Sequence, residues 1–433
     1  MQTEILFIVI TISWIVFGTS FFRWSPIIVL LIASFFLGLC LRINPVNILY
    51  EVFGGFVSTT NKIGALILFG AIIGVCLEKS GATSVISIGI LKKFYKLPLT
   101  YIISIVGFIV SIPVFCDAAF IILSTLNKKL SELSKSSKTS LTVALSTGLF
   151  APHVLVPPTP GPLAAAATLK LDNILFLFIS GAILALFLAL LGAFYSQNFI
   201  KKSNALTKNN LQQLINESES ADIMSFKLAS SPIWIPILLM SLGSILPQNI
   251  SIISTPIFSL FIGVLISIYI SISKIEFKPL ILLCLKQSIP IIAITGMGGA
   301  LGNIIQNINI SMWFSEITNY SYLGILIPFL IAATLKTAQG SSTVSIITTA
   351  SIVYPMLHIF GLENETGKVL AILAIGVGSM TASHANDSYF WIVSQVGELE
   401  VRTAYKTHTF ATLIQGIMGI IILLITNYVL NIF

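Results

Sequence analysis

Long runs of uncharged residues alternate with short polar segments along the whole chain. Residues 5–22 and 24–41 each contain 18 residues without a charge, and residues 173–200 form a longer apolar run. A helix needs about 20 apolar residues to cross a bilayer, so a span with its loop takes about 35 residues. Over 433 residues, this pattern predicts an all-α polytopic membrane protein with about twelve transmembrane spans.

The composition agrees with this pattern and excludes most other classes of protein. Charged residues make up 9% of the chain and apolar residues 56%, with a mean hydropathy of +0.99. A soluble domain carries about 25% charged residues. A soluble enzyme, a disordered protein and a disulfide-rich secreted fold are therefore excluded, and the lipid bilayer is the expected partner.

The net charge of +7 comes from basic residues in short clusters between apolar runs. This distribution is typical of membrane-protein loops, in which Lys and Arg favour the cytoplasm, and not of a nucleic-acid-binding face. The Lys-rich segments 92–96, 128–138 and 201–208 would prefer the cytoplasm, but the unknown parity of the spans leaves the orientation open. The four cysteines lie in apolar segments without metal-ligand spacing, which predicts buried core residues and no metal site.

The two halves of the chain repeat the same order of features. A first half, 1–200, and a second half, 228–433, are joined by the longest polar segment, 201–227. The Gly-rich stretches around Gly70 and Gly296 are separated by 226 residues. Because repeated halves are typical of secondary transporters, we expect two membrane repeats joined by a polar linker.

Three windows have the wrong length or composition for a single helix. Residues 97–127 would extend about 46 Å as a helix, which is too long for one crossing and short for two. Residues 139–169 contain five prolines, all between positions 152 and 162, and we expect 152–162 to be non-helical. Residues 369–397 contain the polar sequence SHANDS. These windows predict broken helices or re-entrant hairpins, which survive at membrane depth only inside protein or beside a wet cavity.

Breaks at matching places in two halves indicate a central binding site. The free N–H groups and positive dipole end of a half-helix favour an anion there, such as a carboxylate. Asp117 has long apolar flanks, and a carboxylate inside the membrane is a functional candidate by default. The structural alternative is a helix end at the membrane interface.

Four further polar residues lie in or beside the apolar windows. His384 and Asp387 are three residues apart, so on a helix they would share one face, as either a functional or a structural pair. His153 precedes most of the prolines and is either a ligand or a satisfied core residue. Lys336 separates two apolar windows and is either a loop charge or a counter-charge for an anion.

Small and amide residues follow Lys336 closely, in the order Gln339, Gly340, Ser341, Ser342 and Thr343. They offer hydroxyl and backbone donors at one point, although Ser and Thr also mediate ordinary helix packing in membranes. Two histidines, His358 and His408, and the carboxylate of Glu78 are expected at the ends of spans without a functional role.

These residues lie in motifs that resemble the gluconate permease family of carboxylate:proton symporters, and the similarity covers nearly the whole chain. The densest matches are FGAIIGVCLEKSGA at 69–82, HVLVPPTPGP at 153–162, LKTAQGSSTVSIITTA at 335–350 and GVGSMTASHANDSYFW at 376–391. The chain departs from the family pattern at Thr159 (His in the pattern), Lys336 (Arg), Ala385 (Val) and Tyr389 (Gly). Lys keeps the charge of Arg but loses its bidentate fork.

The resemblance implies a secondary active transporter in the bacterial inner membrane that imports gluconate, or a related small hydroxy-carboxylate, by proton symport. It also implies a homodimer, and no cofactor is expected. The proton is expected to be carried by Asp117 or Asp387, the two proton-coupling candidates, or by one of His153 and His384, and the sequence does not choose among them. The expected substrate-binding residues are His153, Pro157, Pro158, Thr159, Gly161, Lys336, Gln339, Gly340, Ser341, Ser342, Thr343, His384 and Asn386.

Alternatives stay open at this point. A passive anion channel would need a continuous pore lined by rings of like residues. A symporter for D-serine, or one coupled to Na⁺ instead of a proton, fits the same motifs. An intramembrane enzyme is not expected, because the chain contains no H-E-x-x-H or G-x-S-x-G motif.

Overall fold

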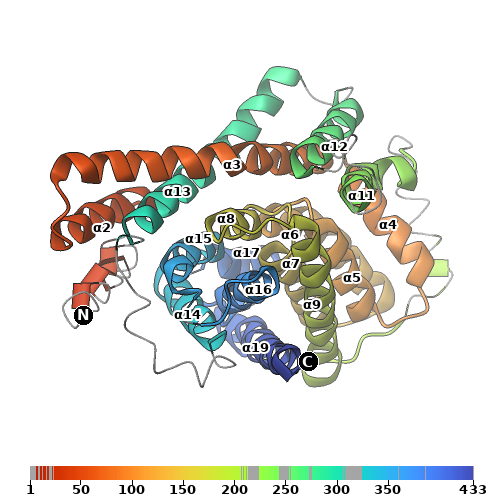
Figure 1. The fold of residues 1–433 in the computed structure, drawn as a ribbon. Helices are drawn as coiled ribbons and strands as arrows, with labels where there is room; N and C mark the ends of the chain where they lie inside the picture. Colours follow the sequence, from red (N-terminus) through yellow and green to blue (C-terminus); the bar gives the residue numbers. More distant parts are fainter. Residues whose placement is uncertain are drawn as a thin grey trace.

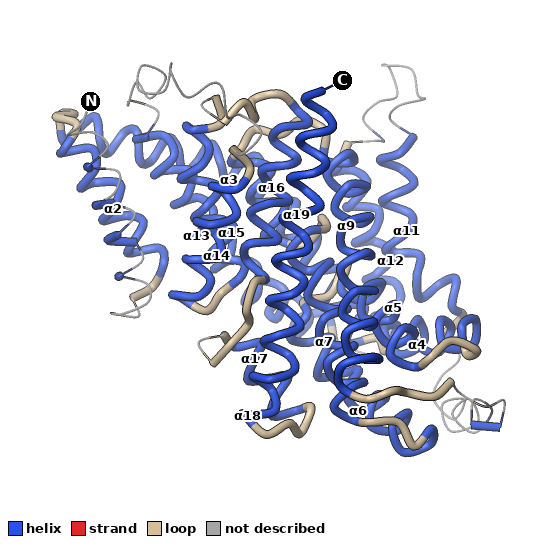
Figure 2. The backbone as a smooth tube through the Cα atoms, turned by 90° about the horizontal axis from the view of Figure 1, so that it is seen from below, coloured by secondary structure: helices blue, strands red, loops and turns tan. Residues whose placement is uncertain are grey.

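The computed structural model of the chain is all-helical over the residues that it describes (Figure 1; Figure 2). These residues are 6–7, 10–11, 13–15, 17–18, 22, 24–205, 207, 209–210, 212, 224–242, 253, 255–272, 276–305, 307, 324–358, 360–385 and 387–432. Within these ranges every regular element is a helix and none is a strand, so the predicted all-α class is confirmed.

The helices divide into two groups on either side of the polar segment. The first group is α2 (Pro26–Cys40), α3 (Pro45–Lys79), α4 (Ala82–Phe94), α5 (Leu99–Ser111), α6 (Cys116–Ser134), α7 (Lys138–Leu155), α8 (Pro160–Thr168), α9 (Ile174–Tyr195) and the π-helical turn η1 (Ser196–Ile200). The second group is α11 (Phe226–Leu242), α12 (Pro256–Ser271), α13 (Phe277–Ile305), α14 (Leu326–Gln339), α15 (Ser342–Val353), η5 (Tyr354–Met356), α16 (Glu365–Met380), α17 (Ser388–Val396), α18 (Val401–Ala404), the π-helical turn η6 (Tyr405–Thr409) and α19 (Phe410–Ile432).

Among the described residues, four helical segments are long and apolar enough to cross a membrane by length and composition: Lys138–Thr168, Ile174–Ile200, Lys278–Ile305 and Val401–Leu430. The two parts of α3, which is bent by 45°, pass the same test together. Other apolar helices of the described chain have only 10–17 residues. The number of about twelve spans stays a prediction, because an apolar window that folds as two short helices does not reveal how often the chain crosses the bilayer.

Four breaks divide the central helices into pairs of short helices. Helices α5 and α6 are separated by 112–115, and α7 and α8 by 156–159. In the second group, α14 and α15 are separated by 340–341, and α16 and α17 by 381–387. Three of these breaks lie inside the three windows that the sequence predicts to be interrupted.

The proline run is more helical than its composition predicts. Helix α7 continues through Pro152 to Leu155, and α8 begins at Pro160, so the non-helical part is limited to 156–159. Proline is tolerated at the first position of a helix because an N–H there has no intrahelical acceptor. Inside a membrane helix, neighbouring groups can satisfy the carbonyl that a proline frees. The expectation that all of 152–162 is non-helical is therefore wrong.

Helix α3 packs directly against both breaks of the first group. A Cβ at Gly70 would lie 2.8 Å from the carbonyl oxygen of Pro158, and a Cβ at Gly74 would lie 2.5 Å from the carbonyl oxygen of Pro113. Only glycine allows backbone to approach this closely. Figure 1 shows α3 running along the outside of the molecule with α13 beside it, so this helix covers the breaks from one side.

Three basic segments that are far apart in the sequence meet at one end of the molecule. The N–H of Leu99, which follows the Lys-rich segment 92–96, donates to the carbonyl of Asn204 at 3.3 Å. The N–H of Asn204 in turn donates to Oγ of Ser136, between α6 and α7, at 3.2 Å. Lys128 and Lys138 flank this loop, and both form ion pairs with Glu398. We define the basic end as residues 92–96, 128–138, 201–204 and 398–406.

Helix α9 separates the basic end from the opposite end by about 33 Å along its axis. At its N-terminus, the N–H groups of Asp172 and Asn173 donate to the carboxylate of Glu365 at 3.1 and 3.2 Å. Lys368 pairs with the same carboxylate at 2.9 Å. In Figure 2, α6 and α18 reach the lower, basic end, and α19 ends at the upper, opposite end.

Replacing Gly55 by Ala is expected to destabilise the protein, because a Cβ at this position would lie 2.6 Å from the carbonyl oxygen of Gly299 in α13. Overpacking of this kind costs about 1–3 kcal/mol. The adjacent Gly54 provides a matched control, since no atom lies within 4 Å of its Cβ position. Thermal unfolding of the purified variants in detergent should give a lower Tm for G55A than for G54A. Equal Tm values would contradict the close packing of α3 on α13.

Candidate functional site

Lys336 lies in the last turn of α14 and is buried at the break before α15. Gly340 ends this helix with a φ of +79°, a left-handed conformation that glycine adopts without strain, and its N–H donates to the carbonyl of Lys336 at 2.8 Å. The Lys336 ammonium folds back and donates to the carbonyl of Gly340 at 3.3 Å. It also lies 5.5 Å from the centre of the Phe150 ring of α7, within cation–π distance.

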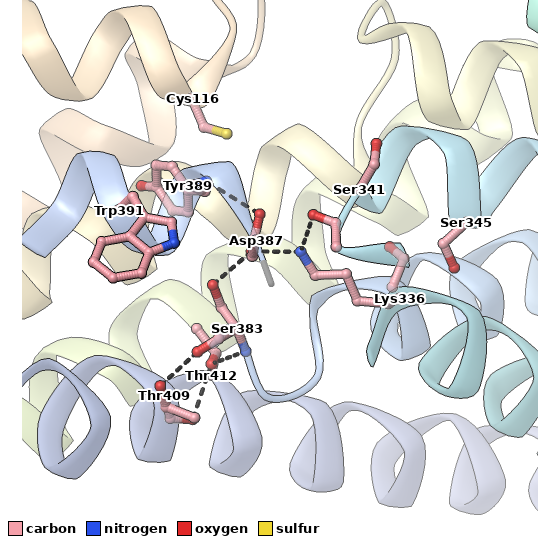
Figure 3. Close-up of polar contacts among 12 residues, drawn as sticks. Cys116, Lys336, Ser341, Ser345, Ser383, Asp387, Tyr389, Trp391, Thr409 and Thr412 are labelled. Atoms are coloured by element: carbon pink, nitrogen blue, oxygen red, sulfur yellow. Dashed lines mark hydrogen bonds and ion pairs between the residues drawn. The ribbon is translucent and has the colours of Figure 1, made fainter. Parts of the chain in front are cut away.

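Asp387 is the N-cap residue of α17, at the break after α16 (Figure 3). Its Oδ1 accepts the N–H of Tyr389 at 3.1 Å, and its Oδ2 accepts the hydroxyl of Ser383 at 2.6 Å. A carboxylate at this position complements the positive end of the helix dipole and satisfies one of the first N–H groups of the helix. The break thus provides a prepared place for a buried carboxylate.

Lys336 and Asp387 form a buried ion pair that joins the two breaks of the second group. Their side chains are only 2% and 5% exposed. Removing an ion from water costs several kcal/mol even after the protein relaxes, so each charge needs the other. The pair has no net charge, and loss of one partner would cost about 3–5 kcal/mol because the other would stay buried and uncompensated.

The turn η6 and helix α19 hold Ser383 in place. The N–H of Ser383 donates to Oγ1 of Thr412 at 2.9 Å, and its carbonyl accepts the hydroxyl of Thr409 at 2.5 Å (Figure 3). With its backbone held in this way, the Ser383 hydroxyl is directed at Asp387. A third part of the chain therefore orients the acidic partner of the ion pair.

Helix α15 begins directly after Gly340, the residue whose carbonyl accepts the Lys336 ammonium. Ser341 is the N-cap residue, and its hydroxyl accepts the N–H of Val344 at 3.3 Å. Ser342 and Thr343 are the first two residues of the helix, a position at which backbone N–H groups have no intrahelical acceptor. The start of α15 therefore has the chemistry of an anion site close to a buried cation.

Three more of the predicted residues surround the ion pair. Asp117 at the start of α6, His153 in α7 and His384 in the break before α17 each lie within electrostatic range of both Lys336 and Asp387. His153 is 6% exposed, and its Nδ1 has no hydrogen-bond partner in the part of the chain that the structure describes. Each of the four breaks therefore contributes a polar side chain to the region around the ion pair.

The predicted residues of the proline turn make local contacts instead. Pro157 and Pro158 line a small apolar cavity with residues of α3, α9, α11 and α12, and no lining residue is charged. The hydroxyl of Thr159 donates to a backbone carbonyl of its own turn at 2.5 Å. Gly161 packs against Ile346 of α15, whose Cδ1 lies 2.8 Å from the position of a Cβ. The turn therefore makes packing contacts with the surrounding helices, and Gly161 of α8 packs against α15.

Two predicted residues cannot be placed in the same way. Asn386 lies outside the described residues, as does the side chain of Gln339, whose backbone ends α14. Over the ranges given above, no three His, Cys, Asp or Glu side chains are grouped closely enough to hold a metal ion.

Two histidines lie in surroundings that the sequence did not predict. His384 and Asp387 do not share a helix face, because the chain between α16 and α17 is non-helical and Asp387 caps the following helix. His408, expected at the end of a span, is fully buried in the π-helical turn η6, which directly precedes α19. This turn packs against α7, where Nδ1 of His408 lies 3.0 Å from Oγ of Ser146.

The sequence did not point to Phe150, Ser383 or Tyr389, which all contact the ion pair. Ser383 and Tyr389 lie in or beside the SHANDS sequence, and Tyr389 is one of the departures from the family pattern. That departure was the available signal, because the Tyr389 hydroxyl reaches α7 and donates to the carbonyl of Ser146 at 2.9 Å. Phe150 carried no signal among the many apolar residues around it.

Comparison with known proteins identifies relatives over the full length. A model of the GntP family permeases matches residues 3–429. The chain is 32% identical over 453 aligned residues to an "uncharacterized permease" of Haemophilus influenzae, covering 97% of this chain and 91% of that protein. It is 29% identical to a gluconate permease of Pseudomonas aeruginosa, covering 97% of both proteins.

Among solved structures, the fold is similar to that of MtrF from Neisseria gonorrhoeae, described as one of a class of antimetabolite efflux pumps. The TM-score is 0.64 over 87% of this chain and 84% of that chain, and at 16% identity this likeness shows the fold alone. The family match confirms the resemblance seen in the sequence motifs. The chain belongs to the GntP family of permeases and is a multi-pass transport protein of the bacterial inner membrane, not an enzyme.

Proposed function

We propose that the chain is a secondary active transporter that imports gluconate, or a related small hydroxy-carboxylate, together with a proton. The observation that carries this proposal is the buried ion pair of Lys336 and Asp387 where broken helices meet. Within one contact, the pair supplies a cation for a substrate carboxylate and a carboxylate for a proton. A passive channel would need no such pair.

The charge balance of the pair couples the substrate to the proton. Without substrate, the Lys336 ammonium neutralises the Asp387 carboxylate. A substrate carboxylate that replaces Asp387 at the ammonium would leave one uncompensated negative charge in a buried site, which is costly. A proton on Asp387 removes that charge, so substrate binding and protonation favour each other by the same free energy.

The substrate carboxylate would bind between Lys336 and the start of α15. Three successive residues, Ser341, Ser342 and Thr343, offer hydroxyl and N–H donors there, and the helix dipole favours a negative charge. Gly340 allows the tight turn that brings these donors close to the ammonium. The proline turn with Pro157, Pro158, Thr159 and Gly161 would support this position by packing behind α15.

The hydroxyl groups of the substrate need partners of a different kind. We assign them to the amides of Gln339 and Asn386 and to the imidazoles of His153 and His384, since each of these side chains can donate or accept a hydrogen bond. The unpaired Nδ1 of His153 supports this assignment. Asp117, within electrostatic range of Asp387, is the second candidate for the proton.

We also propose two membrane repeats, 1–200 and 228–433, that are joined by 201–227 and cross the bilayer about twelve times in total. The order of the helices supports this division. Each half contains a long Gly-rich helix (α3 or α13), then two pairs of short helices with a break (α5/α6 and α7/α8, or α14/α15 and α16/α17), and then a long apolar helix (α9 or α19).

We propose that the basic end faces the cytoplasm. Lys and Arg concentrate in cytoplasmic loops, and the Lys-rich segments 92–96, 128–138 and 201–202 all lie at this end. The opposite end holds the carboxylates of Glu363 and Glu365 as well as its lysines. Import then moves the substrate and the proton from the opposite end to the basic end.

Removal of the charges of the ion pair should abolish transport. Lys336→Ala and Asp387→Asn each leave one buried charge without its partner, at a cost of about 3–5 kcal/mol, so folding must be measured beside transport. The double variant K336M/D387N leaves no buried charge, and we expect it to fold but to transport no labelled gluconate into proteoliposomes. Lys368→Ala, at the opposite end, should keep wild-type uptake. Wild-type rates in K336A or D387N would contradict the proposal.

Uptake should depend on the proton gradient. With acid outside, proteoliposomes should accumulate labelled gluconate above its equilibrium level, because each carboxylate enters with a proton, and a protonophore should abolish this accumulation. Equilibration without accumulation would indicate a passive channel. Accumulation that follows a Na⁺ gradient would identify Na⁺, and not the proton, as the coupling ion. Stronger competition by D-serine than by gluconate would identify D-serine as the preferred substrate.

Cysteine labelling in whole cells tests the orientation. Lys202→Cys at the basic end should react with a membrane-impermeant maleimide only after the cells are permeabilised, because that end is expected in the cytoplasm. Glu363→Cys at the opposite end should react in intact cells. The wild-type protein, whose four cysteines are buried or half-buried, provides the background. The reverse pattern of labelling would contradict this orientation.

A further inference from the structure

One face of α7 is lined with polar groups from the ion pair to the basic end. Thr142 and Ser146 are fully buried and lie at four-residue intervals between Lys138 and Phe150. Neighbouring side chains at this spacing lie one turn apart on a helix, and the row here winds by about 120° around the helix over about 18 Å. Phe150 contacts the ammonium of Lys336 at one end of this row. We call Thr142 and Ser146, with the groups bonded to them, the α7 seam.

The seam ends beside the basic end, where a Cβ at Gly397 would lie 2.6 Å from Cγ2 of Thr142. Asn127 of α6 donates from Nδ2 to Oγ1 of Thr142 at 3.4 Å, and its Oδ1 is buried without a hydrogen-bond partner among the residues described. Next to this contact, Glu398 is more than half exposed and forms ion pairs with Lys138 and Lys128. Hydrogen bonds from these two lysines hold the pKa of Glu398 below its usual value, so this end of the seam is ionised at neutral pH.

His408 lies beside the seam and has no part in the substrate site proposed above. Its side chain is fully buried in the turn η6, with Nδ1 3.0 Å from Oγ of Ser146. Its Nε2 is buried and has no hydrogen-bond partner within the described ranges. A buried nitrogen without a hydrogen-bond partner lowers the stability of the fold. π-Helical turns are rare in proteins, and those that occur are often found at functional sites. Both features call for a functional explanation of His408.

Tyr389 links His408 to the ion pair. Its N–H donates to Asp387 at 3.1 Å, its hydroxyl donates to the carbonyl of Ser146 at 2.9 Å, and its ring centre lies 5.7 Å from that of His408. The charged groups that act on His408 are Asp387 and Lys336, and the neutral Ser146 faces it from α7. His408 therefore lies between the carboxylate of the ion pair and the polar face that leads to the basic end.

We propose that His408 relays the transported proton from Asp387 to the α7 seam and so to the basic end. The unpaired Nε2 accepts the proton and Nδ1 releases one to the hydroxyl of Ser146, so the ring stays neutral but changes from its Nδ1-protonated to its Nε2-protonated tautomer, and it must return to the first tautomer before the next cycle. The Ser146 hydroxyl donates to the carbonyl of Val143 at 3.0 Å, so it must rotate towards Thr142 to pass the proton on. Each of the two hydroxyls can accept one proton and give up another. This inference rests on the proposed function, because it needs a proton that arrives on Asp387 with the substrate.

The substitution His408→Gln tests this relay, because Gln can keep a hydrogen bond to Ser146 but does not titrate. We expect gluconate accumulation driven by a proton gradient to fall by at least about tenfold and to lose its pH dependence. Exchange of labelled for unlabelled gluconate at equal pH needs no net proton movement and should stay close to wild type. His358→Gln is the matched control, since His358 is exposed and pairs with Glu363 at the opposite end at 2.9 Å.

Wild-type accumulation by H408Q would overturn the relay. An equal loss of exchange and accumulation would also overturn it, because that result indicates a role in binding or folding. If H408Q does not fold, Thr142→Val tests the same route, because it removes one hydroxyl of the seam at nearly constant shape. This variant should slow accumulation while exchange persists. Unchanged accumulation in T142V would overturn the route. A wild-type protein that exchanges gluconate but ignores the proton gradient would reject proton coupling itself, and the relay with it.

Discussion

The cost of burying a charge inside the protein is the constraint on which this molecule depends. Lys336 and Asp387 are almost fully buried, and each is tolerated because it neutralises the other. A backbone carbonyl and a hydroxyl satisfy further hydrogen bonds of the pair. The same constraint leads to the proposed function, because a substrate anion at the ammonium disturbs the charge balance and a proton restores it. Binding energy and proton coupling then have one physical origin.

Broken helices make this ion pair possible. A continuous helix keeps its N–H and carbonyl groups for its own backbone, whereas a helix that ends at membrane depth offers them to side chains and ligands. Here a backbone carbonyl at the end of α14 accepts a hydrogen bond from the ammonium, and a backbone N–H at the start of α17 donates one to the carboxylate. In the first half, Gly70 and Gly74 of α3 hold two further breaks close, and these breaks bring Asp117 and His153 towards the pair.

Local features of the sequence predicted the all-helical class, three of the four breaks and the individual charged residues, because a charge or a proline in an apolar run is recognisable without knowledge of the fold. The pairing of Lys336 with Asp387 could not be predicted, since it joins residues 51 positions apart through the packing of α14 against α16. Proline content predicted a break but not its bounds, because a proline at the start of a helix is compatible with that helix. The burial of His408 depends on a π-helical turn, which has no simple sequence pattern.

In the proposed coupling, Asp387 takes up a proton when a carboxylate binds at Lys336. This can be measured on the purified protein by calorimetric titration with gluconate in buffers of different ionisation enthalpy, which gives the number of protons bound with each substrate. We expect uptake of about one proton per gluconate at neutral pH. Saturable binding of gluconate with no uptake of protons would contradict it.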